Sequence, residues 1–174
     1  KGEQNRFSLD FFAKNNRVST QELYFEPSSE GFTVSGENSK SLTMRLPAGP
    51  EQYIEYVYTV TGGSYLVDFD INFVGMQNVI ERNATTLDLH WRNDLPHQEK
   101  SLQNESDNST IYYRFSDDEV DYISERSDDK EEIKTDLQWV GFKQQFFSSV
   151  LINKDRWEGQ SDLETTHDEE SLDV

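Results

Sequence analysis

Hydrophobic and polar positions alternate with a period of two along two consecutive segments in the first half of the chain. The first runs from Tyr53 to Val60 and the second from Tyr65 to Phe73, with Thr61-Gly62-Gly63-Ser64 between them. This period in β-branched and aromatic residues is typical of antiparallel strands with one buried face. Because Gly62 and Gly63 readily adopt the positive φ of a tight turn, we expect a β-hairpin here. The predicted inward positions are Ile54, Tyr56, Tyr58, Val60, Tyr65, Val67, Phe69, Ile71 and Phe73.

Shorter hydrophobic segments, bounded by turn residues or by charged runs, predict further strands. Many short strands separated by such signals predict an all-β fold, an antiparallel β-sandwich with little helix. These segments are Phe7–Phe12, Leu23–Phe25, Phe32–Val34, Leu42–Leu46, Leu87–Trp91 and Ile111–Phe115.

The longest apolar-rich segment, Leu137–Ile152, fits two structures. Its apolar residues could share one helical face, with spacings of three and four. Its β-branched and aromatic residues and its all-β surroundings favour a strand instead. We therefore expect a strand with a β-bulge at Gly141.

The composition narrows the classes of protein. The chain has 174 residues, no cysteine and a net charge of −18. These features exclude disulfides, cysteine-based metal sites and a cysteine nucleophile, and they argue against nucleic-acid binding, which needs a basic face. Aromatic residues make up 13% of the chain, far more than disordered proteins carry, and no segment has the length of a membrane span. We expect a soluble protein or an excised soluble domain.

The negative charge is concentrated in two segments. Ser116–Asp136 and Asp155–Val174 each carry a net charge of −7, which leaves −4 for the rest of the chain. The simplest interpretation is a solvated loop region and a frayed tail. The alternative is a surface that binds cations or a basic partner, which calcium titration would test.

Candidate catalytic and metal-binding groups form no recognisable pattern. The three histidines, His90, His97 and His167, lack metal-ligand spacing. Asp117–Asp121 offers carboxylates at alternate positions, as a calcium loop does, but Tyr122 stands where an EF-hand needs glycine. We therefore expect no metal, no cofactor and no enzymatic activity.

Two blocks of sequence resemble a known family. Tyr53–Ile80 reads YIEYVYTVTGGSYLVDFDINFVGMQNVI and Trp139–Ile152 reads WVGFKQQFFSSVLI. Together with Ile111–Asp129, they resemble the large periplasmic domain of YidC-type membrane protein insertases, particularly those of Bacteroidetes. The likeness extends over residues 6–155, and the absence of membrane helices indicates a fragment. The residues that carry the resemblance in the second block are Trp139, Gly141, Phe142, Gln145, Phe146 and Phe147.

The resemblance implies a fold, a location and partners. The fold would be a β-supersandwich related to galactose mutarotase, with residues 1–155 in one domain and 156–174 as its acidic C-terminal segment or a tail. The domain would lie on the periplasmic side of the bacterial inner membrane. It would assist insertion and folding of membrane proteins through contact with nascent chains or with the Sec translocon subunit SecF.

Such contacts would use a groove or an exposed sheet edge that receives an extended chain. Three aromatic residues that fall off the main apolar faces or near an end are candidate partner contacts: Tyr53, Tyr112 and Trp157.

The alternative is a carbohydrate-binding or sugar-epimerase-like protein of the same sandwich superfamily. Epimerases of that fold use a histidine and a glutamate in the cleft, for which His90 with Glu55 or Glu81 are the candidates. Their spacing in the sequence gives this pairing no support.

Overall fold

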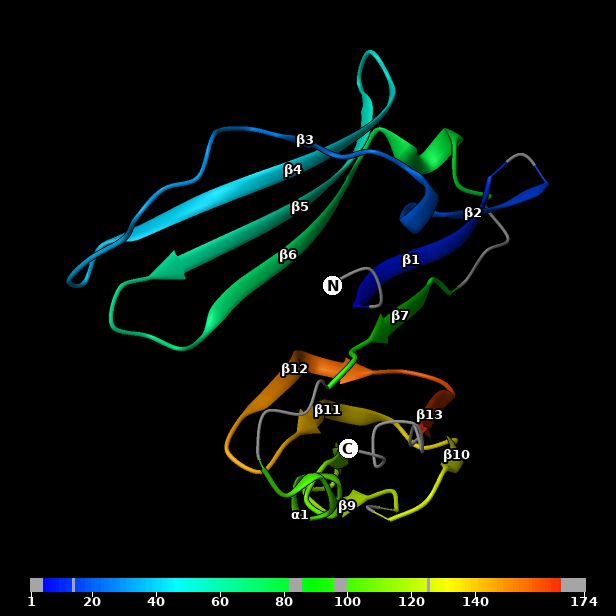
Figure 1. The fold of residues 1–174 in the computed structure, drawn as a ribbon. Coiled ribbons are helices and arrows are strands. Elements are labelled where there is room, and N and C mark those ends of the chain that lie inside the picture. The colour runs from blue at the N-terminus through cyan, green and yellow to red at the C-terminus, as the bar shows by residue number, and fades with distance from the viewer. Residues whose placement is uncertain (1–4, 14, 82–85, 96–99, 125, 167–174) are drawn as a thin grey trace. The chain divides into compact units, whose positions relative to one another are not determined.

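The computed structural model describes residues 5–13, 15–81, 86–95, 100–124 and 126–166. Antiparallel β-sheets make up most of it, which confirms the predicted all-β class (Figure 1). The chain divides into two compact units, residues 1–92 and 93–174, and each has its own hydrophobic core. A single domain over residues 1–155 remains a prediction.

The first unit contains a four-stranded sheet with the order β3-β4-β5-β6. Three of its strands are long and lie side by side in Figure 1. The predicted hairpin is present, with Ile54 opposite Phe73 and Tyr58 opposite Phe69. The strands are β3 (Glu26–Pro27), β4 (Ser39–Gly49), β5 (Gln52–Thr61) and β6 (Val67–Val74).

The hairpin connection is longer than the sequence suggests. Tyr65 lies outside β6 and is fully exposed, and Val67, the first residue of β6, is 53% exposed, so the predicted burial of both residues is wrong. The Ser64 N–H donates to the Thr61 carbonyl at 3.2 Å, and Gly63 takes a positive φ of 75°. Gly62 serves a different purpose, because a Cβ there would lie 2.4 Å from the Gly36 carbonyl oxygen.

A three-stranded sheet completes the first unit, with the order β2-β1-β7. Leu9 and Phe11 of β1 join Ile54 and Tyr56 of β5 in the buried core. The elements are β1 (Arg6–Ala13), β2 (Asn16–Ser19), β7 (Asp88–Arg92) and two short 3₁₀ helices, η1 (Thr20–Glu22) and η2 (Met76–Asn78).

Two predicted strands of this unit are wrong. Leu23–Phe25 and Phe32–Val34 form no strand. Phe25 instead packs against the core with its ring 4.6 Å from that of Tyr56. An apolar triplet therefore marks a contact with the core here without marking a strand.

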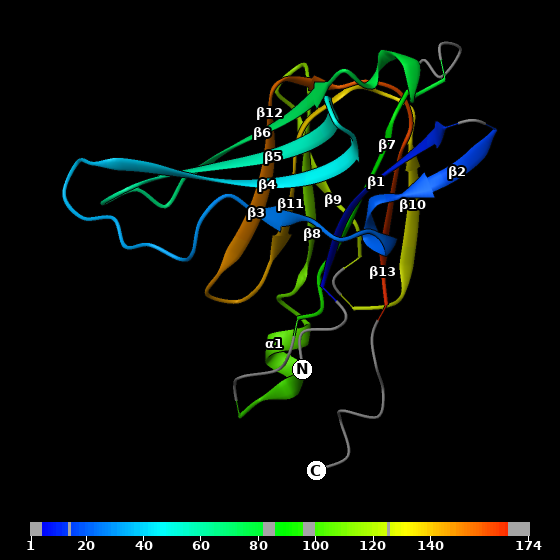
Figure 2. The ribbon, with the colours of Figure 1, turned by 90° about the horizontal axis from the view of Figure 1, so that it is seen from above.

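The second unit holds a four-stranded sheet with the order β12-β11-β8-β9 and a two-stranded sheet of β10 and β13 (Figure 2). Its core contains Tyr113 and Leu137, both fully buried, with Ile133 and Leu163 from the smaller sheet. The elements are α1 (Leu102–Ser106), β8 (Thr110–Phe115), β9 (Val120–Tyr122), β10 (Asp129–Ile133), β11 (Leu137–Lys143), β12 (Ser148–Trp157) and β13 (Ser161–Thr165).

The segment predicted as one strand over 137–152 is a hairpin of β11 and β12. The polar residues Gln144 and Gln145 fall in the connection, where the Gln144 N–H donates to the Phe147 carbonyl at 2.7 Å. The register of β11 shifts between Leu137 and Trp139. The β-bulge therefore lies at Gln138, and its predicted position at Gly141 is wrong.

The two acidic segments contain strands that their charge conceals. β9 and β10 lie within residues 116–136, and β13 lies within residues 155–174, so a loop region and a tail describe them only in part. β10 and β13 pair with one another, with Glu131 opposite Leu163 and Glu132 opposite Asp162. Alternate positions, Ile133 and Leu163, are buried in the core, which gives the pairing its hydrophobic support.

Candidate functional site

One side of the four-stranded sheet in the second unit faces away from the core and is largely apolar. Ile111, Tyr113, Val140 and Phe142 face the core, so the positions between them face the other way. The strand register aligns these positions in two cross-strand rows. We call this surface the apolar face. Its first row is Val150, Gly141, Tyr112 and Tyr122, and its second row is Ile152, Trp139, Arg114 and Val120.

The residues that carry the family resemblance lie on this sheet in three settings. Trp139 and Gly141 belong to the apolar face, whereas Phe142 packs against the core. Gln145, Phe146 and Phe147 lie in the connection between β11 and β12. Phe146 is 66% and Phe147 is 73% exposed, so the hairpin presents two phenyl rings to solvent.

Gly141 has a local structural reason for its identity, whereas the contacts of the described residues give none for Gln145. A Cβ on Gly141 would lie 3.1 Å from Val150 Cγ2, so any side chain there would force Val150 to shift by a few tenths of an ångström. Gln145 Oε1 is buried and has no hydrogen-bond partner among the described residues.

The three candidate contact residues are not brought together. Tyr112 lies on the apolar face, stacked on Tyr122 at 5.0 Å, with Lys143 Nζ 5.6 Å from its ring centre. Tyr53 belongs to the first unit, where the Arg45 guanidinium lies 4.1 Å from its ring. Trp157 packs against the core opposite Leu137. A partner role for these three residues stays a prediction.

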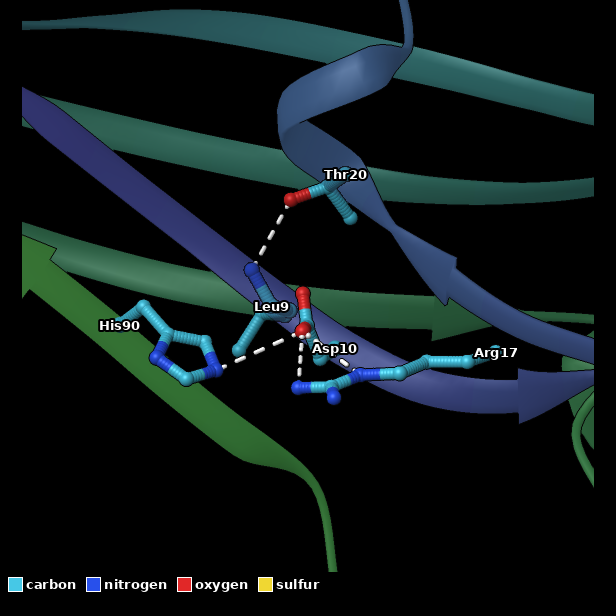
Figure 3. Close-up of polar contacts among 5 residues, drawn as sticks. All are labelled: Leu9, Asp10, Arg17, Thr20 and His90. Carbon is cyan, nitrogen blue, oxygen red and sulfur yellow. Dashed lines mark hydrogen bonds and ion pairs between the residues drawn. The ribbon is translucent and has the colours of Figure 1, made fainter.

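The first unit contains a polar cluster that the sequence analysis missed (Figure 3). Asp10 Oδ2 accepts hydrogen bonds from Arg17 Nε at 3.1 Å and Nη2 at 2.7 Å, and it lies 3.4 Å from His90 Nε2. These residues come from β1, β2 and β7, so the cluster joins all three strands of the sheet. The available signal was a lone carboxylate between two core positions, Leu9 and Phe11.

The electrostatics of this cluster indicate a structural role. Burial raises the pKa of Asp10. Hydrogen bonds from Ser19 and Arg17 and electrostatic attraction to His90 lower this pKa by a larger amount, so it lies below its ordinary value. Asp10 is therefore ionised at neutral pH and holds an ion pair. A general acid or base would need a pKa near the working pH.

The histidine and glutamates of the carbohydrate alternative do not meet. His90 contacts Asp10, Glu55 pairs with Arg45 at 2.6 Å, and Glu81 accepts a hydrogen bond from the Asn15 N–H. Within the described residues, no contact joins His90 to either glutamate.

Metal-binding groups are scattered over the part of the chain that the structure describes, with no cluster of three or more His, Asp or Glu side chains able to hold an ion. Within the Asp117–Asp121 run, Asp118 pairs with Arg114 and Asp121 accepts the Tyr122 N–H at 2.9 Å. His97 and His167 lie outside the described residues. No helix in the described ranges is long and apolar enough to cross a membrane.

The first unit also has a pocket of about 440 Å³ beside the start of β1. Aromatic rings and Met44 form part of its wall, and Asn5, Arg6, Thr20 and Gln21 form the rest. Burial raises the pKa of the Tyr56 and Tyr58 hydroxyls above the ordinary value of 10, so these hydroxyls stay neutral at neutral pH, as tyrosines ordinarily do. Thr20 Oγ1 lies 3.3 Å from the Tyr56 hydroxyl and accepts the Leu9 N–H, which fixes this wall in place. The lining includes Phe7, Phe25, Met44, Tyr56, Tyr58 and Gln21.

Comparisons with known proteins agree with the resemblance. The family model described as the YidC periplasmic domain matches residues 2–172. The chain is 33% identical over 157 residues to a membrane protein insertase YidC of Parabacteroides distasonis, covering 90% of this chain and 24% of that protein. It is 31% identical over 150 residues to the corresponding protein of Chlorobium luteolum, covering 84% and 25%.

The chain thus spans about a quarter of the length of the curated relatives it matches. No solved structure gives a significant match. A family match over nearly every residue, together with relatives above 30% identity over most of the chain, is decisive: this chain belongs to the family of YidC periplasmic domains.

Proposed function

We propose that this chain is the periplasmic part of a bacterial inner-membrane insertase and assists the insertion and folding of membrane proteins by protein–protein contact. Its partners would be nascent membrane proteins or a SecF-like subunit of the Sec translocon. The relatives are named membrane protein insertases, and the matched segment is a periplasmic domain. Binding without catalysis is the activity that this domain would contribute.

The observation that supports this proposal is the exposed apolar surface around the β11–β12 hairpin. Val150 and Ile152 are 48% and 53% exposed on the apolar face, and Phe146 and Phe147 are exposed in the connection of the same hairpin. Exposed contiguous apolar patches in soluble domains mark sites of protein interaction. A domain that meets unfolded membrane proteins needs such a surface.

Site-specific photo-crosslinking in the full-length insertase tests the proposal. A photoreactive amino acid at Phe147 should crosslink to a nascent membrane protein or to a translocon subunit in cells. Tyr24 of the first unit, 91% exposed, is the control position and should give much weaker crosslinks. Equal labelling from both positions, or none from Phe147, would contradict the proposal.

The aromatic pocket favours one alternative function, carbohydrate binding. Aromatic walls and neutral hydroxyl and amide donors suit a sugar ring. A screen of mono- and disaccharides by ligand-observed NMR, repeated with Tyr58→Ala, would detect such binding. Saturable binding lost in this variant would support the alternative, and its absence would remove it.

A further inference from the structure

Most strand edges in this protein carry features that prevent another strand from pairing with them. Natural proteins protect sheet edges by short strands, proline or charge. β3 has two residues and contains Pro27, β9 has three residues, and β2 has four. The longer edge strands carry charged side chains instead. These are Asp68 and Asp70 on β6, Asp88 and Arg92 on β7, Asp129 to Glu132 on β10, and Asp162 and Glu164 on β13.

β12 lacks this protection over its first six residues. It is a ten-residue strand at one edge of its sheet, and Ser148–Asn153 carries no charged side chain. Charge appears only from Lys154 onward. Within the described residues, β12 pairs with β11 and with no other strand.

The charge around β12 also differs from that of the rest of the chain. Residues 137–154 contain no acidic side chain, the longest such stretch in a protein with 34 acids, and they include Lys154 of β12. The other lysine of this stretch, Lys143, donates to the Asn108 carbonyl at 3.0 Å on the β8 side of β11. Exposed apolar side chains flank the same edge, because Val150 and Ile152 are about half exposed. This edge therefore suits an apolar strand with neutral or acidic flanks better than one with basic flanks.

The hairpin geometry shows which backbone groups of β12 are available. In antiparallel pairs, hydrogen-bonded and non-hydrogen-bonded pairs alternate. Gln144 and Phe147 form a hydrogen-bonded pair, so the pairs Phe142–Ser149 and Val140–Leu151 are hydrogen-bonded as well. The N–H and C=O groups of Ser148, Val150 and Ile152 consequently point away from β11, toward the free edge.

We propose that β12 receives an extended apolar segment of a membrane protein as an added strand, paired through the backbone of Ser148, Val150 and Ile152. The phenyl rings of Phe146 and Phe147 then contact the segment beside the hairpin. This inference rests on the proposed function and adds its substrate class, an extended Val/Ile/Leu-rich segment without basic flanks.

Peptide binding to the 174-residue chain tests this inference. The probe is a ten-residue peptide of alternating Val and Thr with Glu at both ends, compared with the same peptide ending in Lys and with one N-methylated at alternate residues. Hydrogen exchange is followed by NMR. We expect the Glu-ended peptide to slow exchange of the Val150 and Ile152 amides, and both comparison peptides to bind about tenfold more weakly.

A proline substitution separates backbone pairing from apolar contact. Val150→Pro removes an N–H that faces the free edge and leaves the β11 ladder intact. Val120→Pro is the matched control: Val120 is 50% exposed on the opposite edge of the same sheet, and its N–H also faces outward, since the Phe115 N–H bonds the Glu119 carbonyl. Val150→Pro should abolish peptide binding, whereas Val120→Pro should leave it unchanged. Ser148→Pro removes another N–H that faces the free edge, and it should abolish binding as well if Val150→Pro fails to fold.

Each other outcome overturns the inference. Equal binding of the N-methylated peptide would show apolar adhesion without strand pairing, and equal losses in the two proline variants would place binding elsewhere. If the Val150 and Ile152 amides exchange more slowly at higher protein concentration in the absence of peptide, the edge pairs with a second copy of the chain. If peptide binding fails while Phe147 still crosslinks in cells, the strand-addition inference fails and the proposed function stands.

Discussion

At the scale of single residues, Asp10 shows how a buried carboxylate can stabilise a sheet. Its side chain is 10% exposed, yet it is held by Arg17 and His90 from the two neighbouring strands. Breaking such a buried pair leaves the remaining groups without full compensation. Solvent weakens the attraction between Asp10 and Arg17, because the Arg17 side chain is 60% exposed.

We expect Asp10→Asn to lower the free energy of unfolding by about 1–2 kcal/mol at pH 7. The pKa of Asp10 lies below its ordinary value of 3.8, so this contribution is complete above that value and disappears as the pH falls through the folded-state pKa. Urea unfolding of both proteins between pH 2 and 7 measures the difference. Asp70→Asn removes an exposed carboxylate from β6, where it lies opposite Val57 and away from Asp10, and should change stability by less than about 0.5 kcal/mol at any pH.

The hairpin glycines differ in the reason that each is needed. Gly63→Ala places a side chain at φ 75° and should cost about 1 kcal/mol. Gly62→Ala should cost more, because its Cβ would meet the Gly36 backbone. Gly31→Ala has open space at an ordinary φ and should be neutral or slightly stabilising. Thermal unfolding gives the order, and a Gly62→Ala variant as stable as Gly31→Ala would contradict the close approach.

At the scale of elements, the pairing of β10 with β13 places two acidic strands side by side. Glu132 lies directly opposite Asp162, whereas Lys130 lies opposite Glu164. Like charges at facing positions destabilise a sheet, and opposite charges stabilise it. The burial of Ile133 and Leu163 must therefore offset the repulsion between Glu132 and Asp162.

Reversing one charge should reveal this repulsion. We expect Glu132→Lys to raise the free energy of unfolding by about 0.2–1 kcal/mol at low salt and by less at 1 M salt. Glu164→Lys, which would face Lys130, should have the opposite sign. Guanidinium is itself a salt, so urea unfolding at two ionic strengths is the appropriate measurement. Two variants that shift stability in the same direction would rule out the facing-pair explanation.

The strands differ in how well the sequence pattern predicts them. The hairpin of β5 and β6 was predictable, because one core-facing side imposes a period of two between Ile54 and Ile71. β10 and β13 were not, because each contributes a single buried apolar side chain, Ile133 or Leu163, among charged residues. The Asp10 cluster was equally hidden, since Arg17 reaches Asp10 across the β1–β2 hairpin and His90, which is distant in sequence, comes near only through the pairing of β1 with β7.

At the scale of the whole molecule, the chain has two cores that share no residue. Ile54 is fully buried in the first unit and Leu137 in the second. The net charge of −18 comes mainly from the second unit, which contains both acidic segments. The β12 edge therefore lies in the more acidic unit, within the stretch of that unit that has no acids.

Separate cores predict separable responses to core mutations. We expect Ile54→Ala and Leu137→Ala each to cost about 2–4 kcal/mol, because both leave a cavity. Native-state hydrogen exchange should accelerate mainly in residues 1–92 for Ile54→Ala and in residues 93–174 for Leu137→Ala. Uniform acceleration over the whole chain in both variants would instead indicate a single cooperative unit.

The pairing of β10 with β13 has a consequence for the order in which the protein is made. Synthesis runs from the N-terminus, so β10 emerges well before its partner, whose first residue lies 28 positions after the last residue of β10. During that interval β10 is a strand without a neighbour, the state in which β-proteins misassociate. Its acidic side chains repel β10 strands of other copies. The charge that weakens the β10–β13 pair in the folded protein therefore prevents β10 from associating with other copies until β13 has been synthesised.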